Sequence, residues 1–321
     1  MCDMELSEYL AEVAQDVDLA IHRHFGTPYG ELTKASAHLL TAGGKRLRPA
    51  MLFLSADSVN KGSAFELMPA ALAIELIHSF TLIHDDIMDK DSERRGVPTV
   101  HTLWDEPTAI LAGDVLYAQA FEFLCRTPAP DNARVRAVSL LARTCAEICD
   151  GQYLDMSFEA KDEVSEVDYL EMVRKKTGSL YAAAASMGAI LAGGKPMQAD
   201  ALYQYGLTTG IAFQIQDDLI DLTVPSSVSG KDRGSDIREG KKTLIAIRAR
   251  EKGIELPRGP LSEGDVVRVL KELEGASVIA EVRAMAERVL GTGKACLGVI
   301  PESGEKRLLI ALGDHFLARG L

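Results

Sequence analysis

Apolar residues recur at spacings of three and four along nearly the whole chain, and this spacing constrains the fold more than any other feature. It is clear in segments 6–25, 109–125 and 199–222. An α-helix brings every third or fourth residue to one face, whereas a half-buried strand alternates every second residue. No segment keeps a period of two for long, so the sequence predicts roughly ten or more helices and no sheet.

Glycine and proline clusters fall where these helices should end. Some helical segments, such as 67–83, are apolar almost all round, and such helices lie inside large bundles. No linker or low-complexity stretch divides the 321 residues. We therefore expect residues 1–321 to form a single all-α domain, a large helical bundle. The clusters that end helices are Gly43–Gly44, Pro128–Pro130, 193–196 and Pro257–Pro260.

Charge and cysteine usage exclude several classes of protein. Lys and Arg number 35 against 47 Asp and Glu, and a net charge of −12 argues against non-specific nucleic-acid binding. The five cysteines form no CxxC pair, which is typical of reduced thiols in a cytoplasmic protein. The acidic N-terminus lacks a signal-peptide pattern, and no uninterrupted apolar stretch reaches the roughly 18 to 20 residues of a membrane span. We expect a cytoplasmic location, no nucleic-acid partner and no membrane span.

A DDxxD pattern occurs twice, each time at one end of an apolar helical segment. Six carboxylates around one cavity would repel one another and would be costly to bury. Divalent cations remove that cost, and oxygen-only ligation suits Mg²⁺. A single DDxxD is often a solvated helix end, but two such motifs followed by basic residues are hard to explain as surface. The first motif is Asp85, Asp86 and Asp89, and the second is Asp217, Asp218 and Asp221.

Basic residues cluster in four places against the acidic balance of the chain. Taken singly, each cluster is more often a solvated face or a helix C-terminal charge. Arginine forks and lysine point charges are also what diphosphate oxygens require. No GxxxxGK[ST] loop is present, so nucleotide hydrolysis is not expected. The clusters are Lys45, Arg46 and Arg48; Arg94 and Arg95; Lys175 and Lys176; and Lys231, Lys241 and Lys242.

Six collinear motifs resemble those of the trans-isoprenyl diphosphate synthases. They are "GGKRLRP", "LIHDDIMDKDSERRGVPTVH", "AGDVLYAQAF", "KKTGSLY", "FQIQDDLIDL" and "GKDRGSDIREGKKT", and they span about residues 40–245. The resemblance implies a large all-α bundle around a deep apolar cavity, usually as a homodimer. It also implies three Mg²⁺ ions, with isopentenyl diphosphate and an allylic diphosphate as substrates.

The resemblance assigns roles to individual residues. The two acidic motifs hold the metal ions; in the second, Asp217 ligates and the others act through water. Lys176, Thr177 and Gln214 form the catalytic set, in which the dipoles of Thr177 and Gln214 face the developing carbocation. The allylic diphosphate contacts are Arg94, Lys176, Lys231 and Lys241, and the isopentenyl diphosphate pocket contains Lys45, Arg48, His78 and Arg95.

His78 taken alone has a second interpretation. A lone histidine in an apolar helix is more often a core residue with its hydrogen bonds satisfied. Its position seven residues before Asp85, two helical turns away on nearly the same face, favours a role in the site instead.

The implied reaction is ionisation followed by condensation. Neutralising the diphosphate lets the allylic C–O bond break to a delocalised cation, which isopentenyl diphosphate attacks through its double bond. The apolar helices then exclude water from the cation. A class I terpene cyclase shares the first motif, but its usual second motif is asymmetric and it lacks "GGKRLRP". A non-catalytic partner subunit would have lost one or both acidic motifs.

Product length is predicted from the residues just before the first acidic motif. Phe80 lies five residues before Asp85, about 7.5 Å along the helix axis, and Thr81 lies four before it. A single aromatic residue at the fifth position resembles geranylgeranyl (C20) synthases of the archaeal type. We expect C20 as the main product, with farnesyl (C15) or a longer chain as the alternative. Ordinary core packing is the other interpretation of Phe80.

Overall fold

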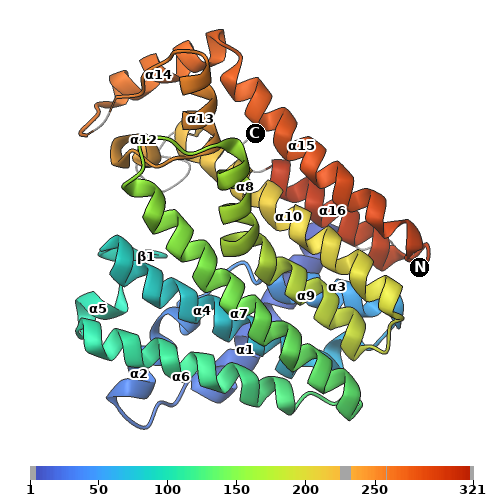
Figure 1. The fold of residues 1–321 in the computed structure, drawn as a ribbon. Coiled ribbons are helices and arrows are strands. Elements are labelled where there is room, and N and C mark those ends of the chain that lie inside the picture. The colour runs from blue at the N-terminus through green and yellow to red at the C-terminus, as the bar shows by residue number, and fades with distance from the viewer. Residues whose placement is uncertain (1–4, 225–232, 258, 319–321) are drawn as a thin grey trace. The chain divides into compact units, whose positions relative to one another are not determined.

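The structure is a computed structural model that describes residues 5–224, 233–257 and 259–318. Helices make up nearly all of its regular structure, which confirms the all-α prediction (Figure 1). The first half contains α1 (Leu6–Phe25), α2 (Glu31–Thr41), α3 (Leu47–Val59), η1 (Ala64–Leu67), α4 (Met68–Asp89), α5 (Val100–Leu103), α6 (Glu106–Cys125) and α7 (Asp131–Glu159). The second contains α8 (Glu166–Val173), η2 (Arg174–Gly178), α9 (Ser179–Leu191), α10 (Pro196–Thr223), α12 (Ser235–Glu239), α13 (Leu244–Glu251), α14 (Glu263–Gly275), α15 (Val278–Cys296), η3 (Leu297–Val299) and α16 (Gly304–Ala318).

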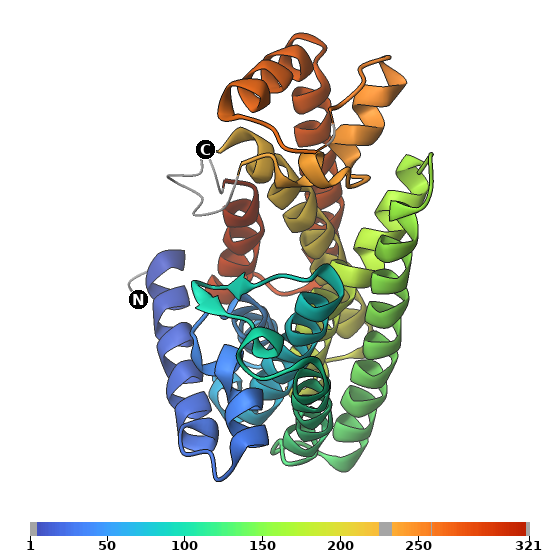
Figure 2. The ribbon, with the colours of Figure 1, turned by 90° about the vertical axis from the view of Figure 1, so that its left-hand side faces the viewer.

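A short hairpin is the exception to the predicted absence of sheet. Strands β1 (Glu93–Arg94) and β2 (Val97–Pro98) pair antiparallel, with Arg94 opposite Val97 (Figure 2). The two turn residues Arg95 and Gly96 have φ of 55° and 73°. Positive φ at both positions is the requirement of a type I′ turn, which matches the twist of a hairpin. Strands of two residues are too short for a period of two to register in the sequence.

The described chain divides into two compact units. One contains residues 5–145, 183–203 and 299–309, and the other contains 146–182, 204–224, 233–257, 259–298 and 310–318. That residues 1–321 form a single domain stays a prediction.

The first unit is built on the contact between α4 and α6. These two helices lie side by side along much of their length (Figure 1). Gly113 of α6 permits this, because a Cβ at that position would overlap the ring of His84 on α4. Ala70 to Ile74 and Leu76 to Ile77 of α4 are almost completely buried, which explains why this helix is apolar all round.

These two helices are also long and apolar enough to cross a membrane by length and composition alone. Their most apolar windows have mean hydropathies of 1.4, for residues 64–89, and 1.2, for α6. The protein itself buries 61% of the first window and 39% of the second. Core helices of bundles pass the same test, so the absence of a membrane span stays a prediction.

The second unit brings three helical segments into backbone contact at η2, a single turn of π-helix that we call the π-turn. On one side, a Cβ at Gly151 of α7 would overlap the backbone of Lys176. On the other side, a Cβ at Gly210 of α10 would lie 2.8 Å from the Cα of Gly178. The glycines therefore hold the π-turn closely between α7 and α10. Elsewhere in this unit, α15 contacts both α13 and α14 (Figure 2).

Candidate active site

The first acidic motif occupies the last turn of α4, and its three carboxylates face different surroundings. Asp86 points inward and is buried, whereas Asp89 is exposed and Asp85 is half-buried. Arg94 donates a hydrogen bond to Oδ1 of Asp86, and the buried Oδ2 has no hydrogen-bond partner among the described residues. Burial raises the pKa of the Asp86 carboxyl, and Arg94 partly opposes this shift. Asp85 and Asp89, one turn apart, share the other face of the helix.

The hairpin after α4 ties both of its arginines to neighbouring backbone and carboxylates. Arg94 Nη2 donates to Asp91 Oδ2 at 3.0 Å, in addition to its bond to Asp86. Arg95 Nη1 donates to the carbonyl oxygens of Gly43 at 2.5 Å and of Leu39 at 3.2 Å. The type I′ turn thus sends adjacent arginines to two places, one at the acidic motif and one at the glycine turn of "GGKRLRP".

His78 is surrounded by the arginines that the sequence grouped with it. Burial lowers the pKa of His78 well below its usual value, and the positive charges of Arg48 and Arg95 lower it further. The charges of Arg48 and Arg95 therefore both act on His78. Lys45, in the turn before α3, is exposed. Such a cluster of cations around a neutral imidazole is suited to an anion with several oxygens.

Arg46 belongs to the fold and not to the basic surface of its turn. The side chain is 2% exposed; it donates to Glu75 Oε2 at 2.7 Å, to Asp18 Oδ1 at 2.8 Å and to the Leu40 carbonyl. It links α1, α2 and α4 at the start of α3. In "KRLR" the sequence offers no sign of which basic residue is buried, because the partners lie far away along the chain.

In the second acidic motif Asp218 is buried, and both of its carboxylate oxygens accept hydrogen bonds. Tyr169 of α8 donates its hydroxyl to Oδ2 at 2.6 Å, and Gln214 donates Nε2 to Oδ1 at 3.0 Å. Gln214 in turn accepts from the Thr177 hydroxyl at 3.0 Å. Burial raises the pKa of Asp218 to about 8, the Asp236 carboxylate adds to this, and the hydrogen bonds oppose it. Thr177 and Gln214, predicted to act together, do lie in contact.

Asp221, one turn later, anchors the segment that carries Lys241. Its Oδ1 accepts from the Ser235 hydroxyl at 2.5 Å, and its Oδ2 accepts from the backbone N–H of Asp236 at 3.2 Å. Both donors lie in the first turn of α12. At the other end of this short helix, Lys241 Nζ lies 3.1 Å from Glu239 and 3.4 Å from Asp236. Lys231 lies outside the described residues.

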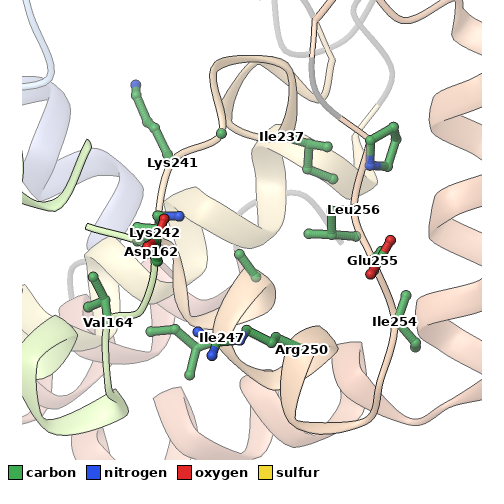
Figure 3. A pocket seen from close by; sticks show the side chains of 13 residues that line it. Asp162, Val164, Ile237, Lys241, Lys242, Ile247, Arg250, Ile254, Glu255 and Leu256 are labelled. Atoms are coloured by element: carbon green, nitrogen blue, oxygen red, sulfur yellow. The ribbon is translucent and has the colours of Figure 1, made fainter. Parts of the chain in front are cut away.

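The segment after α12 sends its two lysines in different directions. Lys241 and Lys242 both line a cavity of about 410 Å³, and their side chains point in different directions (Figure 3). The segment 241–243 is not helical, so successive side chains diverge. The predicted diphosphate contact, Lys241, thus lies at the same cavity as Lys242. The cavity is also lined by Val164, Ile237, Ile247, Ile254 and Leu256.

The π-turn presents Lys176 toward a carboxylate that sequence reasoning missed. Lys176 Nζ donates to Asp155 Oδ2 at 2.6 Å. Asp155 lies four residues after Gly151 on α7, so the glycine that admits the π-turn and the carboxylate that meets its lysine are one helical turn apart. That spacing in "GQYLD" was the available signal. Lys175, by contrast, lies 3.4 Å from Asp150 and 3.7 Å from Glu171.

The donor sets of both motifs fit a divalent cation. Among the residues that the structure describes, no three His, Cys, Asp or Glu side chains are grouped so as to hold a metal ion by themselves. Mg²⁺ usually takes one or two carboxylates and completes its shell with water and substrate phosphate. The buried Oδ2 of Asp86 and the raised pKa values of Asp86 and Asp218 mark places where added positive charge would be stabilising.

The structure therefore gathers the predicted residues into two clusters, one in each unit. In the first unit Arg94 bonds Asp86, and the charges of Arg48 and Arg95 act on His78. In the second unit Thr177, Gln214 and Asp218 are connected. That both acidic motifs serve one reaction stays a prediction. The connecting residues that the sequence did not single out are Asp155, Tyr169 and Ser235.

Comparison with known proteins assigns the chain to a family. The polyprenyl synthetase model matches residues 30–258. A geranylgeranyl pyrophosphate synthase of Geoglobus acetivorans is 50% identical over 291 residues, which cover 90% of this chain and 91% of the relative. A geranylfarnesyl diphosphate synthase of Natronomonas pharaonis is 47% identical, covering 90% of each chain. The solved Geoglobus acetivorans structure has a TM-score of 0.90 at 47% identity and covers 97% of this chain and 99% of its own. The chain belongs to the polyprenyl synthetase family, the trans-prenyltransferases with the all-α isoprenoid synthase fold.

Proposed function

We propose that this prenyltransferase condenses isopentenyl diphosphate with an allylic diphosphate and releases mainly the C20 product, geranylgeranyl diphosphate. The observation that carries the product length is Phe80, the aromatic side chain five residues before Asp85. Relatives named geranylgeranyl synthases at 45–50% identity support it. The Natronomonas relative, named a geranylfarnesyl synthase, makes C25 the strongest longer-chain alternative.

Phe80 is part of a row of aromatic side chains between α4 and α6. Its ring centroid lies 4.7 Å from that of His84 and 5.3 Å from that of Tyr117. Tyr117 in turn lies 5.2 Å from Phe121. Edge-to-face contacts of this kind hold the Phe80 ring in one orientation. A rigid aromatic wall of this kind would stop a growing apolar chain, and Thr81 beside it is too small to do so.

Replacing Phe80 tests this assignment. Phe80→Ala opens an apolar cavity that a longer product can fill, so the main product should lengthen to C25 or beyond. Phe123→Leu is the matched control, because Phe123 lies on α6 but packs against His24 and Phe25 of α1. Mass analysis of the products decides the question. A folded, active Phe80→Ala enzyme that still makes C20 would show that another residue limits the chain.

Members of this family use Mg²⁺, and we propose three ions, held chiefly by Asp85, Asp89 and Asp217. When bound, the ions neutralise the negative charge that develops on the leaving diphosphate. Asp86 and Asp218 then orient their neighbours, since each already engages a protein donor. Asp85→Ala and Asp217→Ala should each lower kcat by about 100- to 1,000-fold. Removal of metal with EDTA should abolish turnover and Mg²⁺ should restore it; full activity in metal-free buffer would contradict the proposal.

The other site residues divide into two groups by the substrate they bind. Lys45, Arg48, His78 and Arg95 bind isopentenyl diphosphate, while Arg94, Lys176, Lys231 and Lys241 bind the allylic diphosphate. Arg48→Ala should therefore raise KM for isopentenyl diphosphate and leave the allylic KM unchanged. An equal or larger rise in the allylic KM would reverse the assignment.

Thr177 and Gln214 are proposed to stabilise the allylic cation. The Thr177 hydroxyl proton is donated to Gln214, so lone pairs remain on both oxygens as negative dipole ends. Dipoles fixed before the reaction stabilise charge without having to reorganise. Thr177→Val should lower kcat more than it changes either KM; a change confined to KM would assign Thr177 to substrate binding instead.

We also propose a homodimer in which α6 packs against its counterpart in a second copy. Ile110 and Leu111 of α6 are 46% and 53% exposed although the helix is strongly apolar. Leu111, Val115 and Ala118 follow one another at helical spacing, so they form a stripe of apolar surface. A cytoplasmic location stays a prediction from the cysteine usage, which fractionation of cells would test.

A further inference from the structure

Tyr169 of α8, the helix just before the π-turn, contacts the second acidic motif. The residue is 1% exposed, and its hydroxyl donates to Asp218 Oδ2 at 2.6 Å. It lies eight residues before Thr177, which is part of the π-turn. A buried tyrosine hydroxyl needs a partner, but a carboxylate is an unusual one, because burying an acid is costly unless the acid is itself required.

The hydrogen bonds that start at Tyr169 fix the orientation of an amide. Asp218 accepts the Tyr169 hydroxyl at Oδ2 and the Gln214 Nε2 at Oδ1, at 3.0 Å, so the amide of Gln214 turns its nitrogen toward Asp218. Its Oε1 then points the other way and accepts from Thr177 at 3.0 Å. Four side chains are thus connected by directed hydrogen bonds: Thr177 donates to Gln214, and both Gln214 and Tyr169 donate to Asp218. The negative ends of the dipoles are the oxygen atoms of Gln214 and Thr177.

We propose that Tyr169 is a positioning residue, whose hydroxyl holds Asp218 so that Gln214 keeps its oxygen available to the allylic cation. This inference rests on the proposed function. Without the hydroxyl, Oδ2 of Asp218 loses its donor, and the carboxylate can rotate away from Gln214. The amide can then turn over and present its N–H groups, whose positive ends repel the cation. That loss is felt in the transition state and not in substrate binding.

Tyr169→Phe tests the proposal, because it removes the hydroxyl and keeps the ring. We expect kcat to fall about tenfold, as for loss of one hydrogen bond to a charged group. KM for isopentenyl diphosphate and the Mg²⁺ concentration for half-maximal rate should stay within about twofold. Tyr205→Phe is the matched control: Tyr205 is also fully buried, but its hydroxyl lies beside Gly313 of α16. Its kcat should be unchanged.

A double-mutant cycle separates positioning from general destabilisation. If Tyr169 acts through Gln214, Tyr169→Phe should have almost no effect on kcat in a Gln214→Ala background. A tenfold loss in both backgrounds would overturn the proposal, as would an unchanged kcat in the single variant. An inactive wild-type enzyme would instead contradict the proposed function, which keeps the two failures distinct.

Asp218→Asn provides a second test of the proposal if the Tyr169→Phe variant does not fold. Asparagine offers one acceptor where Tyr169 and Gln214 each need one, so kcat should fall about tenfold or more. The Mg²⁺ concentration for half-maximal rate should stay within about twofold of the wild-type value. A rise in the Mg²⁺ requirement that saturating metal corrects would make Asp218 a metal ligand and overturn the positioning role.

Discussion

At the scale of single residues, the two acidic motifs divide their work in the same way. The second aspartate of each, Asp86 and Asp218, is buried and engages a protein donor. Asp85 and Asp89 lie one turn apart on the more exposed face. Helical geometry accounts for this, because the residue after the first is rotated about 100° around the axis. The first motif therefore presents two carboxylates outward and one inward, whereas in the second Asp221 also accepts hydrogen bonds from α12.

His78 provides a prediction about pH at this scale. Its pKa is well below the usual value in the folded protein, whereas in the unfolded chain it is about 6.5. As the pH falls below that value, the unfolded state takes up a proton that the folded state does not, so stability is lost. The contribution of His78 to the free energy of unfolding that is present above pH 6.5 should fall by at most about 1.4 kcal/mol per pH unit.

Urea unfolding of wild type and His78→Gln between pH 7.5 and about 5.5 measures this effect. The difference in unfolding free energy between the two proteins should shift in favour of His78→Gln as the pH falls. Taking this difference cancels the pH-dependent contributions of the other titrating groups, which the two proteins share. Parallel pH profiles would mean that His78 takes up its proton in the folded protein as readily as in a peptide.

At the scale of elements, the proposed catalytic residues depend on a π-turn that close backbone packing supports. Glycines on α7 and α10 face it, at Gly151 and Gly210. The extra residue in a π-turn changes the helical register, so Lys176 turns toward Asp155 and Thr177 toward Gln214. The helices on either side thus set the positions of both of these side chains, which we propose to be catalytic.

Gly151→Ala should therefore disturb both stability and catalysis. Its methyl group would overlap the Lys176 backbone, and such overpacking typically costs about 1–3 kcal/mol. We expect a lower Tm and a lower kcat. Gly291→Ala of α15 is the control, since a Cβ there meets nothing within 4 Å. It should raise stability by up to about 1 kcal/mol through helix propensity. Equal effects of both substitutions would show that the π-turn tolerates displacement.

At the scale of the whole molecule, the exposed face of α6 predicts the assembly. An apolar stripe of this kind is suited to a second copy, and a two-fold axis would place α6 against its own counterpart. In sedimentation analysis the wild type should be a dimer. Leu111→Asp should shift it to monomer, while Val135→Asp on α7, at a position 67% exposed, should not. A monomeric wild type would contradict the proposed interface.

The family resemblance and the all-α fold could be predicted from the chain alone because both depend on local patterns. Six motifs within about residues 40–245 identified the family, and the family model matches residues 30–258. Periodicity of three and four predicted helices that the structure confirms. The hairpin from Glu93 to Pro98 was not predicted, because it is specified by the conformation of its turn residues Arg95 and Gly96 and not by an alternating strand pattern.

The sequence by itself determined the helices, the family and the kinds of residue that carry the chemistry, because spacing along a helix fixes which side chains share a face. Only the tertiary structure decided what each charged group does. It paired Arg46 with Glu75 and Asp18, and it placed the Tyr169 hydroxyl against Asp218. A buried charge must find its partner wherever the fold brings one, and Arg46 and Glu75 lie 29 residues apart. No local pattern carries that information.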